Sequence, residues 1–405
     1  MSVVTPTRHS QNWPIVYLGF LALAMCFSTR AALGLIMPVW KSELGWSASF
    51  ISGVGAAALI VMALIAPFAG NLADRHGPRA VLGAGLLALS LGCAIIAATS
   101  NQYVFAFAFA GLCAIGFGFV ATHVVSTAVA RNFETSRGLA TGMATSGSTG
   151  GQFVLVPLIA GLLSVASWRW SFAGLSLGCL ALLPFVYFSL APKAEKTVSA
   201  AGHGLTASFA SDLVLILKQP TFHILFWSFF VCGFTTSGVI ETHLLPFASY
   251  CGFPPMPSAA AYGFLSAVNL LGMIGSGWLT DRVNRPVLLG SIYALRGLTF
   301  VILANMPGMS IDMLFVFAAL FGVVDYSTVP VTASLVSTHV GLRVMGFAMG
   351  IISGGHAVGA ALGAFTGGYL FDLTGNYSIL WIAALWLSLG AGLLVLLTLK
   401  MSPVP

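Results

Sequence analysis

Four ionisable side chains interrupt apolar stretches that are long enough to cross a membrane. They are Arg30, Glu241, Arg296 and Asp325. An ionised side chain at the centre of a bilayer costs at least about 2.5–3.5 kcal/mol on insertion scales, so each one must face a cavity or a partner. At a rise of about 1.5 Å per residue, Arg30, Arg296 and Asp325 fall near mid-depth and Glu241 near the outer end of its helix. These positions indicate a polar site inside the membrane.

Arg30 is the first candidate for binding an anion. Its planar guanidinium matches the geometry of a carboxylate or a phosphate, and its own helix carries no acid near it. The alternative is a structural ion pair with an acid on another helix.

Arg296 and Asp325 lie on consecutive helices at similar depth, which predicts a buried ion pair between them. The pair is either purely structural or a proton-binding element. In the second case, protonation of Asp325 would free Arg296 to meet an anion.

Neutral and titratable side chains extend this site. Histidine titrates near pH 6.5 and can relay protons, although a single histidine in a helix also serves as an interhelical hydrogen bonder. Glu241 and His243 are expected to flank the outer mouth, either as an outer gate or proton entry or as a solvated interfacial pair. The other candidates are Asn269, Tyr326 and His356 near mid-depth, Gln152 on the fifth helix, and His123 nearer the cytoplasm.

The elements that position these residues follow from composition. Of 405 residues, 58% are hydrophobic and 6% are charged, with a mean hydropathy of +0.98. A soluble domain carries roughly 25% charged residues, so lipid must be the solvent for most of the surface. The net charge of +6 is distributed over short loops rather than one exposed face, which argues against nucleic-acid binding. The six cysteines form no CxxC pair, and no metal or other cofactor is expected.

Apolar runs of about 20 residues predict an all-α membrane protein with twelve spans. The start of the chain lacks a signal-peptide cleavage pattern, so its apolar run is interpreted as the first helix. The stretch 192–220 is expected to be a cytoplasmic linker loop between two six-helix bundles, 1–191 and 221–405. The predicted spans are 14–39, 47–72, 79–99, 102–129, 138–164, 169–191, 221–248, 258–280, 286–305, 310–337, 343–370 and 377–400.

The distribution of basic residues predicts the orientation of the chain. The turns on one side carry only Lys41 and Arg169. The termini and loops of the other side carry Arg8, Arg75, Arg79, Arg131, Arg137, Lys193, Lys196, Lys218, Arg282, Arg285, Arg343 and Lys400. Basic residues concentrate in cytoplasmic loops. Both termini are therefore expected to be cytoplasmic, in a bacterial-type inner membrane.

The two halves repeat each other. Gly70-Asn-Leu-Ala-Asp-Arg75 follows the second helix, and Gly277-Trp-Leu-Thr-Asp-Arg282 follows the eighth. Arg137-Gly-Leu-Ala-Thr-Gly142 opens the fifth helix, and Arg343-Val-Met-Gly-Phe-Ala-Met-Gly350 opens the eleventh. Two matches at nearly one offset indicate an internal duplication of a six-helix unit. The fifth and eleventh helices are also rich in glycine, which predicts close helix packing.

These motifs carry a family resemblance. The loop GNLADRHGPR resembles the signature loop of the major facilitator superfamily, and GWLTDRVNRP is similar to its second copy. The segment Arg131–Gly138 and the turn Ser167–Phe172 resemble the branch that holds monocarboxylate porters and oxalate–formate-type antiporters. The resemblance implies a rocker-switch transporter with a central cavity lined mainly by helices 1, 4, 7 and 10.

The signature loops predict a gate. A carboxylate at the end of a helix can accept hydrogen bonds from another helix's N-terminus and from a neighbouring arginine. Such contacts can close one face and break when it opens. The alternative is a solvated turn that only sets topology. The gating candidates are Asp74, Arg75, Arg137, Asp281 and Arg282.

Three classes of function follow from these features. The two mid-depth arginines and the titratable side chains around them favour a transporter of a small organic anion that takes protons as its coupling ion. The resemblance to the monocarboxylate porter branch implies a carboxylate, a monocarboxylate above all. A monomer is expected, because nothing in the sequence demands a partner. Exchange of the same class of anion, or drug/proton efflux, is the alternative. A sensor or a membrane enzyme is disfavoured because no catalytic or nucleotide motif occurs. Monocarboxylate porters carry an Asp and an Arg on helix 8, where this sequence has Asn269 and Met273, so Arg296 and Asp325 are the available replacement.

Overall fold

The computed structural model of the chain describes residues 13–189 and 209–401, and these residues form helices and turns without strands. Twelve helical segments in this described part are long and apolar enough to cross a membrane. Each predicted span overlaps one of them, and no end differs by more than four residues. The chain is therefore an all-α, multi-pass membrane protein, as the sequence predicts.

The N-terminal half contributes six of these spans. The fourth span is divided into four pieces, including a π-helical turn, η1, and the fifth is divided into two. The elements are α1 (Trp13–Glu43), α2 (Ala48–His76), α3 (Pro78–Ala98), α4 (Gln102–Phe107), η1 (Ala108–Cys113), α5 (Ala114–Phe119), α6 (Thr122–Asn132), α7 (Arg137–Thr145), α8 (Gly147–Val165) and α9 (Trp168–Ser189).

The C-terminal half contributes the other six. Its seventh span contains the π-helical turn η2, and its tenth span is broken between α15 and α16. The elements are α11 (Pro220–Gly233), η2 (Phe234–Ile240), α12 (Glu241–Tyr250), α13 (Pro255–Thr280), α14 (Arg285–Ala304), α15 (Asp312–Val324), α16 (Thr328–His339), η3 (Leu342–Val344), α17 (Met345–Thr374), α18 (Ser378–Leu396) and η4 (Leu397–Lys400).

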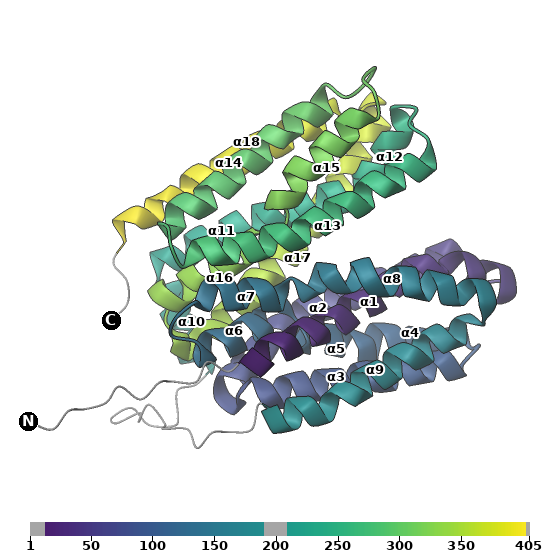
Figure 1. Cartoon of the computed structure of the whole chain (residues 1–405), viewed down its shortest axis with the longest axis horizontal. Coiled ribbons are helices and arrows are strands. Elements are labelled where there is room, and N and C mark those ends of the chain that lie inside the picture. Colours follow the sequence, from purple (N-terminus) through teal and green to yellow (C-terminus); the bar gives the residue numbers. More distant parts are fainter. Residues whose placement is uncertain (1–12, 190–208, 402–405) are drawn as a thin grey trace, which may run out of the picture.

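Each half forms a bundle around its own apolar core. One buried cluster draws all its residues from the N-terminal half, and two others lie in the C-terminal half apart from Ala130. Figure 1 shows the two bundles lying close at one end and diverging toward the other. The predicted pair of six-helix bundles is confirmed.

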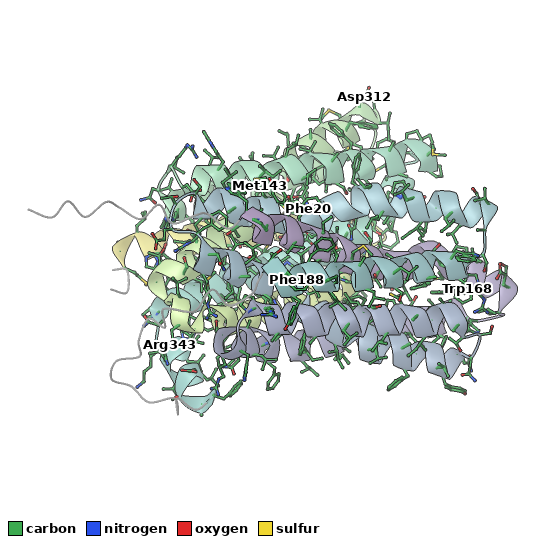
Figure 2. The ribbon with its side chains drawn as sticks, turned by 60° about the horizontal axis from the view of Figure 1, so that its bottom comes forward. Phe20, Met143, Trp168, Phe188, Asp312 and Arg343 are labelled. Atoms are coloured by element: carbon green, nitrogen blue, oxygen red, sulfur yellow. The ribbon has the colours of Figure 1, made fainter. Side chains whose placement is uncertain are left out.

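The beginning of α1 and the end of η4 lie at the same end of the molecule, which we call the terminal face (Figure 1). There the ring of Trp13 lies 5.5 Å from that of Phe133, and Thr221 lies beside Met401. Arg343 lies toward this end in Figure 2, whereas Trp168 lies at the opposite face. The terminal face therefore carries the signature loops.

The bundles touch through glycines near the terminal face. A Cβ atom on Gly70 of α2 would lie 1.9 Å from the carbonyl oxygen of Gly346 on α17. A Cβ on Gly138 of α7 would lie 2.4 Å from the carbonyl oxygen of Gly277 on α13. Helix backbones can approach this closely only where side chains are absent. The glycine-rich helices thus allow the halves to meet at this face.

The linker differs from its prediction. Residues 190–208 lie outside the described residues, but the end of the predicted loop is a helix, α10 (Phe209–Leu217). Its apolar side chains pack onto both halves: the ring of Phe209 lies 5.7 Å from that of Phe68 and 4.6 Å from that of Phe347. Apolar contact with the bundles explains why this segment is ordered as a helix.

Candidate functional site

Arg30 and Gln152 lie together in the N-terminal half. They line a pocket of about 240 Å³ between α1, α2, α8 and the η1–α5 segment, whose other walls are largely apolar. The Arg30 guanidinium carbon lies 4.9 Å from the centre of the Phe27 ring. The three ion pairs found in residues 13–189 and 209–401 all involve other residues. Arg30 is therefore a half-buried cation that no acid of the described chain neutralises.

A break in the tenth span creates the polar centre of the C-terminal half. Helix α15 ends at Val324 and α16 begins at Thr328. The fourth span has the equivalent break, because α6 begins at Thr122, 206 residues before Thr328. Broken helices expose backbone polar groups at mid-membrane, and such positions form substrate and ion sites in transporters.

Arg296 binds this break rather than the side chain of Asp325. Its Nη2 atom donates to the carbonyl oxygen of Val324 at 2.6 Å and also to that of Asp325. No ion pair joins the Arg296 guanidinium to the Asp325 carboxylate, so the predicted ion pair is wrong for this structure. The physical reason is the helix end: its last carbonyls lack intrahelical donors, and a cation is favoured there.

Asn269 of α13 takes the place expected for Arg296 beside the carboxylate. Its Nδ2 donates to Asp325 Oδ2 at 3.2 Å and to Thr149 Oγ1, also at 3.2 Å. Its Oδ1 accepts from the backbone N–H of Tyr326 at 3.1 Å. Because Thr149 belongs to the other half, this amide joins the two bundles at the site.

Glu241 also reaches this site. The Tyr326 hydroxyl donates to Glu241 Oε1 at 2.7 Å and lies 3.0 Å from the Ser237 hydroxyl. Glu241 is exposed, whereas Asp325 is buried. Tyr326 therefore contacts both parts of the site: its hydroxyl bonds the accessible carboxylate, and its backbone N–H bonds the Asn269 amide that holds the buried one.

The three candidate histidines do not form one cluster. His243 is not paired with Glu241: its Nε2 lies 2.9 Å from the Ala364 carbonyl oxygen, and its ring packs on Tyr377. This corrects the expected pair at the outer mouth, because His243 ties α12 to α17. The His356 ring lies 6.5 Å from that of Tyr326, and its Nε2 has no hydrogen-bond partner among the described residues.

His123 lies apart from both halves of the site. It is the second residue of α6, directly after the break in the fourth span. It is buried, and neither of its ring nitrogens has a hydrogen-bond partner in the described part of the chain. It does not line the Arg30 pocket.

The two signature aspartates make equivalent contacts across the terminal face. Asp74 accepts from the backbone N–H groups of Gly346 and Phe347 at 2.9 and 2.7 Å. Asp281 accepts from those of Gly138 and Leu139 at 2.7 and 2.9 Å. Each carboxylate thus binds the N-terminal end of a helix, the kind of contact that the signature loops predict, and that helix belongs to the opposite half.

The arginines at this face differ from the prediction. Asp74 pairs with Arg131, whose Nη2 lies 2.6 Å from Asp74 Oδ1, and not with the adjacent Arg75. Arg282 lies 4.0 Å above the Trp278 ring and joins no ion pair of the described chain. Arg137 donates to the carbonyl oxygen of Phe133 at 2.9 Å. A residue that directly follows an aspartate points away from it on the helix, so the partner comes from another helix.

Asp212 of α10 forms ion pairs that the sequence did not predict. It lies 3.0 Å from Arg343 Nη2 and 3.7 Å from Arg75 Nη2. These arginines belong to opposite halves. In the sequence, Asp212 stands out only as an acid among apolar residues. The signal for the Arg131 contact with Asp74 was the position of Arg131 at the end of the fourth span. Thr149 and Ser237 gave no signal, since hydroxyl residues are common in membrane helices.

No cluster of His, Cys, Asp and Glu in residues 13–189 and 209–401 could hold a metal ion. The candidate groups are an unneutralised guanidinium in one bundle and, in the other, two carboxylates that accept from different donors: Glu241 from the Tyr326 hydroxyl and Asp325 from the Asn269 amide. Two six-helix bundles that carry buried polar groups and meet through Asn269 and Thr149 form the architecture of a membrane transporter.

The comparisons identify its family. A model of the Major Facilitator Superfamily matches residues 19–346, and the chain belongs to that superfamily. It is 26% identical over 384 residues to the uncharacterized MFS-type transporter YcxA of Bacillus subtilis (strain 168), with 92% of each chain covered. It is 27% identical over 396 residues to Monocarboxylate transporter 13 of Rattus norvegicus, covering 97% of this chain and 90% of that one.

Solved structures share the fold. The proton:xylose symporter XylE bound to 6-bromo-6-deoxy-D-glucose superimposes with a TM-score of 0.77 at 14% identity, covering 97% of this chain and 96% of that one. The chain is therefore a major facilitator transporter and not an enzyme.

Proposed function

We propose that this protein is a secondary active transporter of a small organic anion, of the monocarboxylate class, coupled to protons. The observation that carries the proposal is Arg30, a guanidinium in a pocket with no acid partner in the described chain. A cation held in low dielectric without a counter-ion attracts an anion that can supply one. The relative named as a monocarboxylate transporter supports the same class of substrate.

The carboxylates of the other bundle support proton coupling. An anionic substrate that bridges the bundles from Arg30 would approach Asp325 and Glu241, and like charges in a low dielectric repel strongly. Binding of a proton to one of them removes that repulsion. The Tyr326 hydroxyl bonds Glu241 and the Asn269 amide bonds Asp325, so both proton-accepting carboxylates are held at the site by neutral donors. We propose that Asp325 binds the coupling proton and that Glu241 admits it, with His356 as a further relay.

In a transporter that works by alternating access, the contacts at the terminal face would act as the gate of one side. We propose that this face is cytoplasmic, in a bacterial-type inner membrane, and that the halves divide within 192–220. The bonds of Asp74 and Asp281 to the opposite half then close the cytoplasmic side, with Arg131 and Arg137 supporting them. The structure would represent an outward-facing state of a protein that functions as a monomer.

Uptake into proteoliposomes tests the proposal. Radiolabelled monocarboxylates of two to four carbons are offered with and without an inward proton gradient, to the wild type, Arg30→Ala and Arg30→Lys. Lys41→Ala is the matched control, because it removes an exposed cation from the same helix. Gel filtration and thermal unfolding verify that each variant is folded.

We expect saturable uptake that the gradient enhances, that Arg30→Ala abolishes and that Lys41→Ala retains. Arg30→Lys should keep the charge and lose the fork geometry, so uptake falls without vanishing. Uptake only into vesicles preloaded with a second anion would replace proton coupling by exchange. Transport of lipophilic cations without any carboxylate would overturn the anion proposal.

A further inference from the structure

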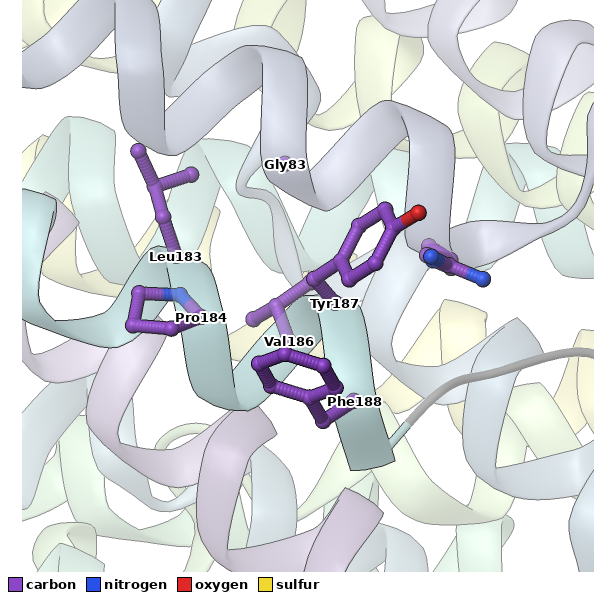
Figure 3. Close-up of a pocket in the computed structure, with 7 residues that line it drawn as sticks. Gly83, Leu183, Pro184, Val186, Tyr187 and Phe188 are labelled. Carbon is purple, nitrogen blue, oxygen red and sulfur yellow. The ribbon is translucent and has the colours of Figure 1, made fainter.

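A groove on the outer surface of the N-terminal bundle is unrelated to the transport site. It has a volume of about 340 Å³ and lies between the beginning of α3 and the end of α9, at the terminal face. Its walls are Gly83 and the apolar side chains of α9, as Figure 3 shows. Its lining residues are Arg79, Gly83, Leu183, Pro184, Val186, Tyr187 and Phe188.

The groove opens toward lipid. Phe188 is 74% exposed and Tyr187 is 61% exposed. On a membrane protein, large apolar side chains with such exposure face the bilayer, and tyrosine is enriched at the level of the lipid headgroups. A Cβ atom added to Gly83 would meet no atom within 4 Å, so the space above this glycine is empty of protein.

One cation stands at the end of this apolar groove. The Arg79 guanidinium carbon lies 3.7 Å from the centre of the Tyr187 ring. Such cation–π contact holds the guanidinium in place and leaves its N–H groups free to donate. Arg79 takes part in no ion pair within the part of the chain that the structure describes. A fixed cation at headgroup level beside an apolar groove is complementary to a molecule that carries both an anionic group and an apolar chain.

We propose that this groove binds one anionic phospholipid from the leaflet at the terminal face. The phosphate of the headgroup accepts hydrogen bonds from Arg79, and an acyl chain lies in the groove over Gly83, against Pro184 and Phe188. Basic pockets between helices on the cytoplasmic side bind anionic headgroups in this way. The site is independent of the proposed transport function, since neither Arg30 nor Asp325 lines it.

Native mass spectrometry of the purified full-length chain tests the proposal. Phosphatidylglycerol and phosphatidylethanolamine with identical acyl chains are titrated against the wild type, Arg79→Ala and Gly83→Leu. The leucine removes the space for the acyl chain and keeps the cation. Arg282→Ala is the first control, because Arg282 also lies over an aromatic ring, Trp278, but lines no part of this groove.

The second control is Gly174→Leu, since Gly174 is an exposed glycine of α9 whose Cβ would also meet nothing within 4 Å. We expect the wild type to retain one phosphatidylglycerol in preference to phosphatidylethanolamine. Arg79→Ala should lower its affinity for phosphatidylglycerol about fivefold. Gly83→Leu should lower the affinity for both lipids, and both controls should match the wild type.

Two results would contradict the proposal of a phospholipid site. Equal losses in Arg79→Ala and Arg282→Ala would mean that anionic lipid is attracted by surface charge alone. Competition by inorganic phosphate as strong as that by phosphatidylglycerol would mean that the groove takes no acyl chain. Because Arg79→Ala leaves the helix packing intact, its result stands even if Gly83→Leu proves unstable.

Discussion

Arg296 contacts Asp325 through the backbone carbonyl and not through the carboxylate. The guanidinium therefore stabilises the break in the tenth span, while the Asp325 side chain remains bonded to Asn269 alone, with Oδ1 free of any partner in the described chain. The Asp325 carboxylate is buried without an ion-pair partner in the described chain, as a proton-binding group of our proposal requires. Arg296 is thus a positioning residue for the carboxylate that we assign to coupling.

Replacement of Arg296 by methionine should destabilise the protein. The carbonyl groups of Val324 and Asp325 would lose their donor in a site without exposure to solvent, and an unsatisfied buried polar group costs about 1–3 kcal/mol. Thermal unfolding in detergent measures the effect, and Arg296→Lys should recover part of it because an ammonium also donates.

Arg169→Met provides the matched comparison for this prediction. Arg169 likewise donates to two carbonyl oxygens at a helix end, those of Ala97 and Thr99, but it is only half-buried at the opposite face. Water can replace it there, so its loss should cost less than that of Arg296. An unfolding temperature for Arg296→Met at or above that of Arg169→Met would contradict the capping role.

Replacement of Asn269 by leucine should uncouple transport from the proton gradient. The amide links Asp325 to Tyr326 and to Thr149 of the other half, and leucine keeps the branched shape at Cγ without any hydrogen bond. A bond to a charged group contributes about 1.5–3 kcal/mol, so we expect gradient-driven accumulation in proteoliposomes to fall at least about tenfold. Exchange between equal anion pools should fall less.

Thr149→Val separates the two roles of Asn269. It removes only the bond between the bundles and leaves the Asp325 contact in place. If coupling depends on Asp325, Thr149→Val should retain gradient-driven uptake. Equal losses in both variants would assign the effect to bundle contact instead.

The sequence predicted the fold because its signals are local. A run of about 20 apolar residues must be helical in lipid, since its backbone has no other hydrogen-bond partner. The duplicated loops around Asp74 and Asp281 predicted equivalent contacts with helix N-termini for the same reason: the repeat fixes which helix follows which. Arg30 and Gln152 were each predicted as candidates, but their position in one pocket comes from the structure.

The features that the sequence missed depend on contacts between distant segments. Pro330 is the one mark of a break near Asp325: it lies in the first turn of α16 and has no N–H to bond the Tyr326 carbonyl. A proline also lies inside the unbroken helix α2, at Pro67, so Pro330 alone does not predict the break. Arg296 was therefore matched to a side chain rather than to open carbonyls. Arg131 and Asp212 find their partners 57 or more residues away, and such pairings require the packed bundles.

Loss of either signature carboxylate should open the terminal face. Asp74→Asn and Asp281→Asn each weaken two hydrogen bonds between a charged acceptor and backbone N–H groups. Bonds to charged groups contribute about 1.5–3 kcal/mol, so the ratio of open to closed molecules should rise at least about tenfold. Arg131→Ala should reproduce part of the Asp74 effect and leave the Asp281 contact unchanged.

Distances between spin labels on Glu134 and Val283 measure this opening, because both residues are exposed and belong to opposite halves. Cys251→Ser supplies the background, since the other five cysteines are buried. An unchanged distance distribution in both aspartate variants would show that these bonds do not hold the face closed.

Asp212→Asn should also weaken the closure of the terminal face, because Asp212 of the linker helix α10 contacts both halves. Asp212 lies between Arg343 of one half and Arg75 of the other, so its charge attracts both. Half-exposed ion pairs contribute about 0.5 kcal/mol each, so loss of both should cost about 1 kcal/mol and raise the ratio of open to closed molecules about fivefold, less than for Asp74→Asn. The effect should shrink at 1 M salt, where the Debye length is about 3 Å.

Asp312→Asn is the control for this last variant, because Asp312 is exposed and bonds only locally to Ser310. It should leave the label distances as in the wild type. Opening in Asp212→Asn that persists at high salt would assign the closure to the rings of Phe209, Phe68 and Phe347. In that case Phe209→Ala should open the face more than Asp212→Asn does, since the apolar contact does not depend on ionic strength.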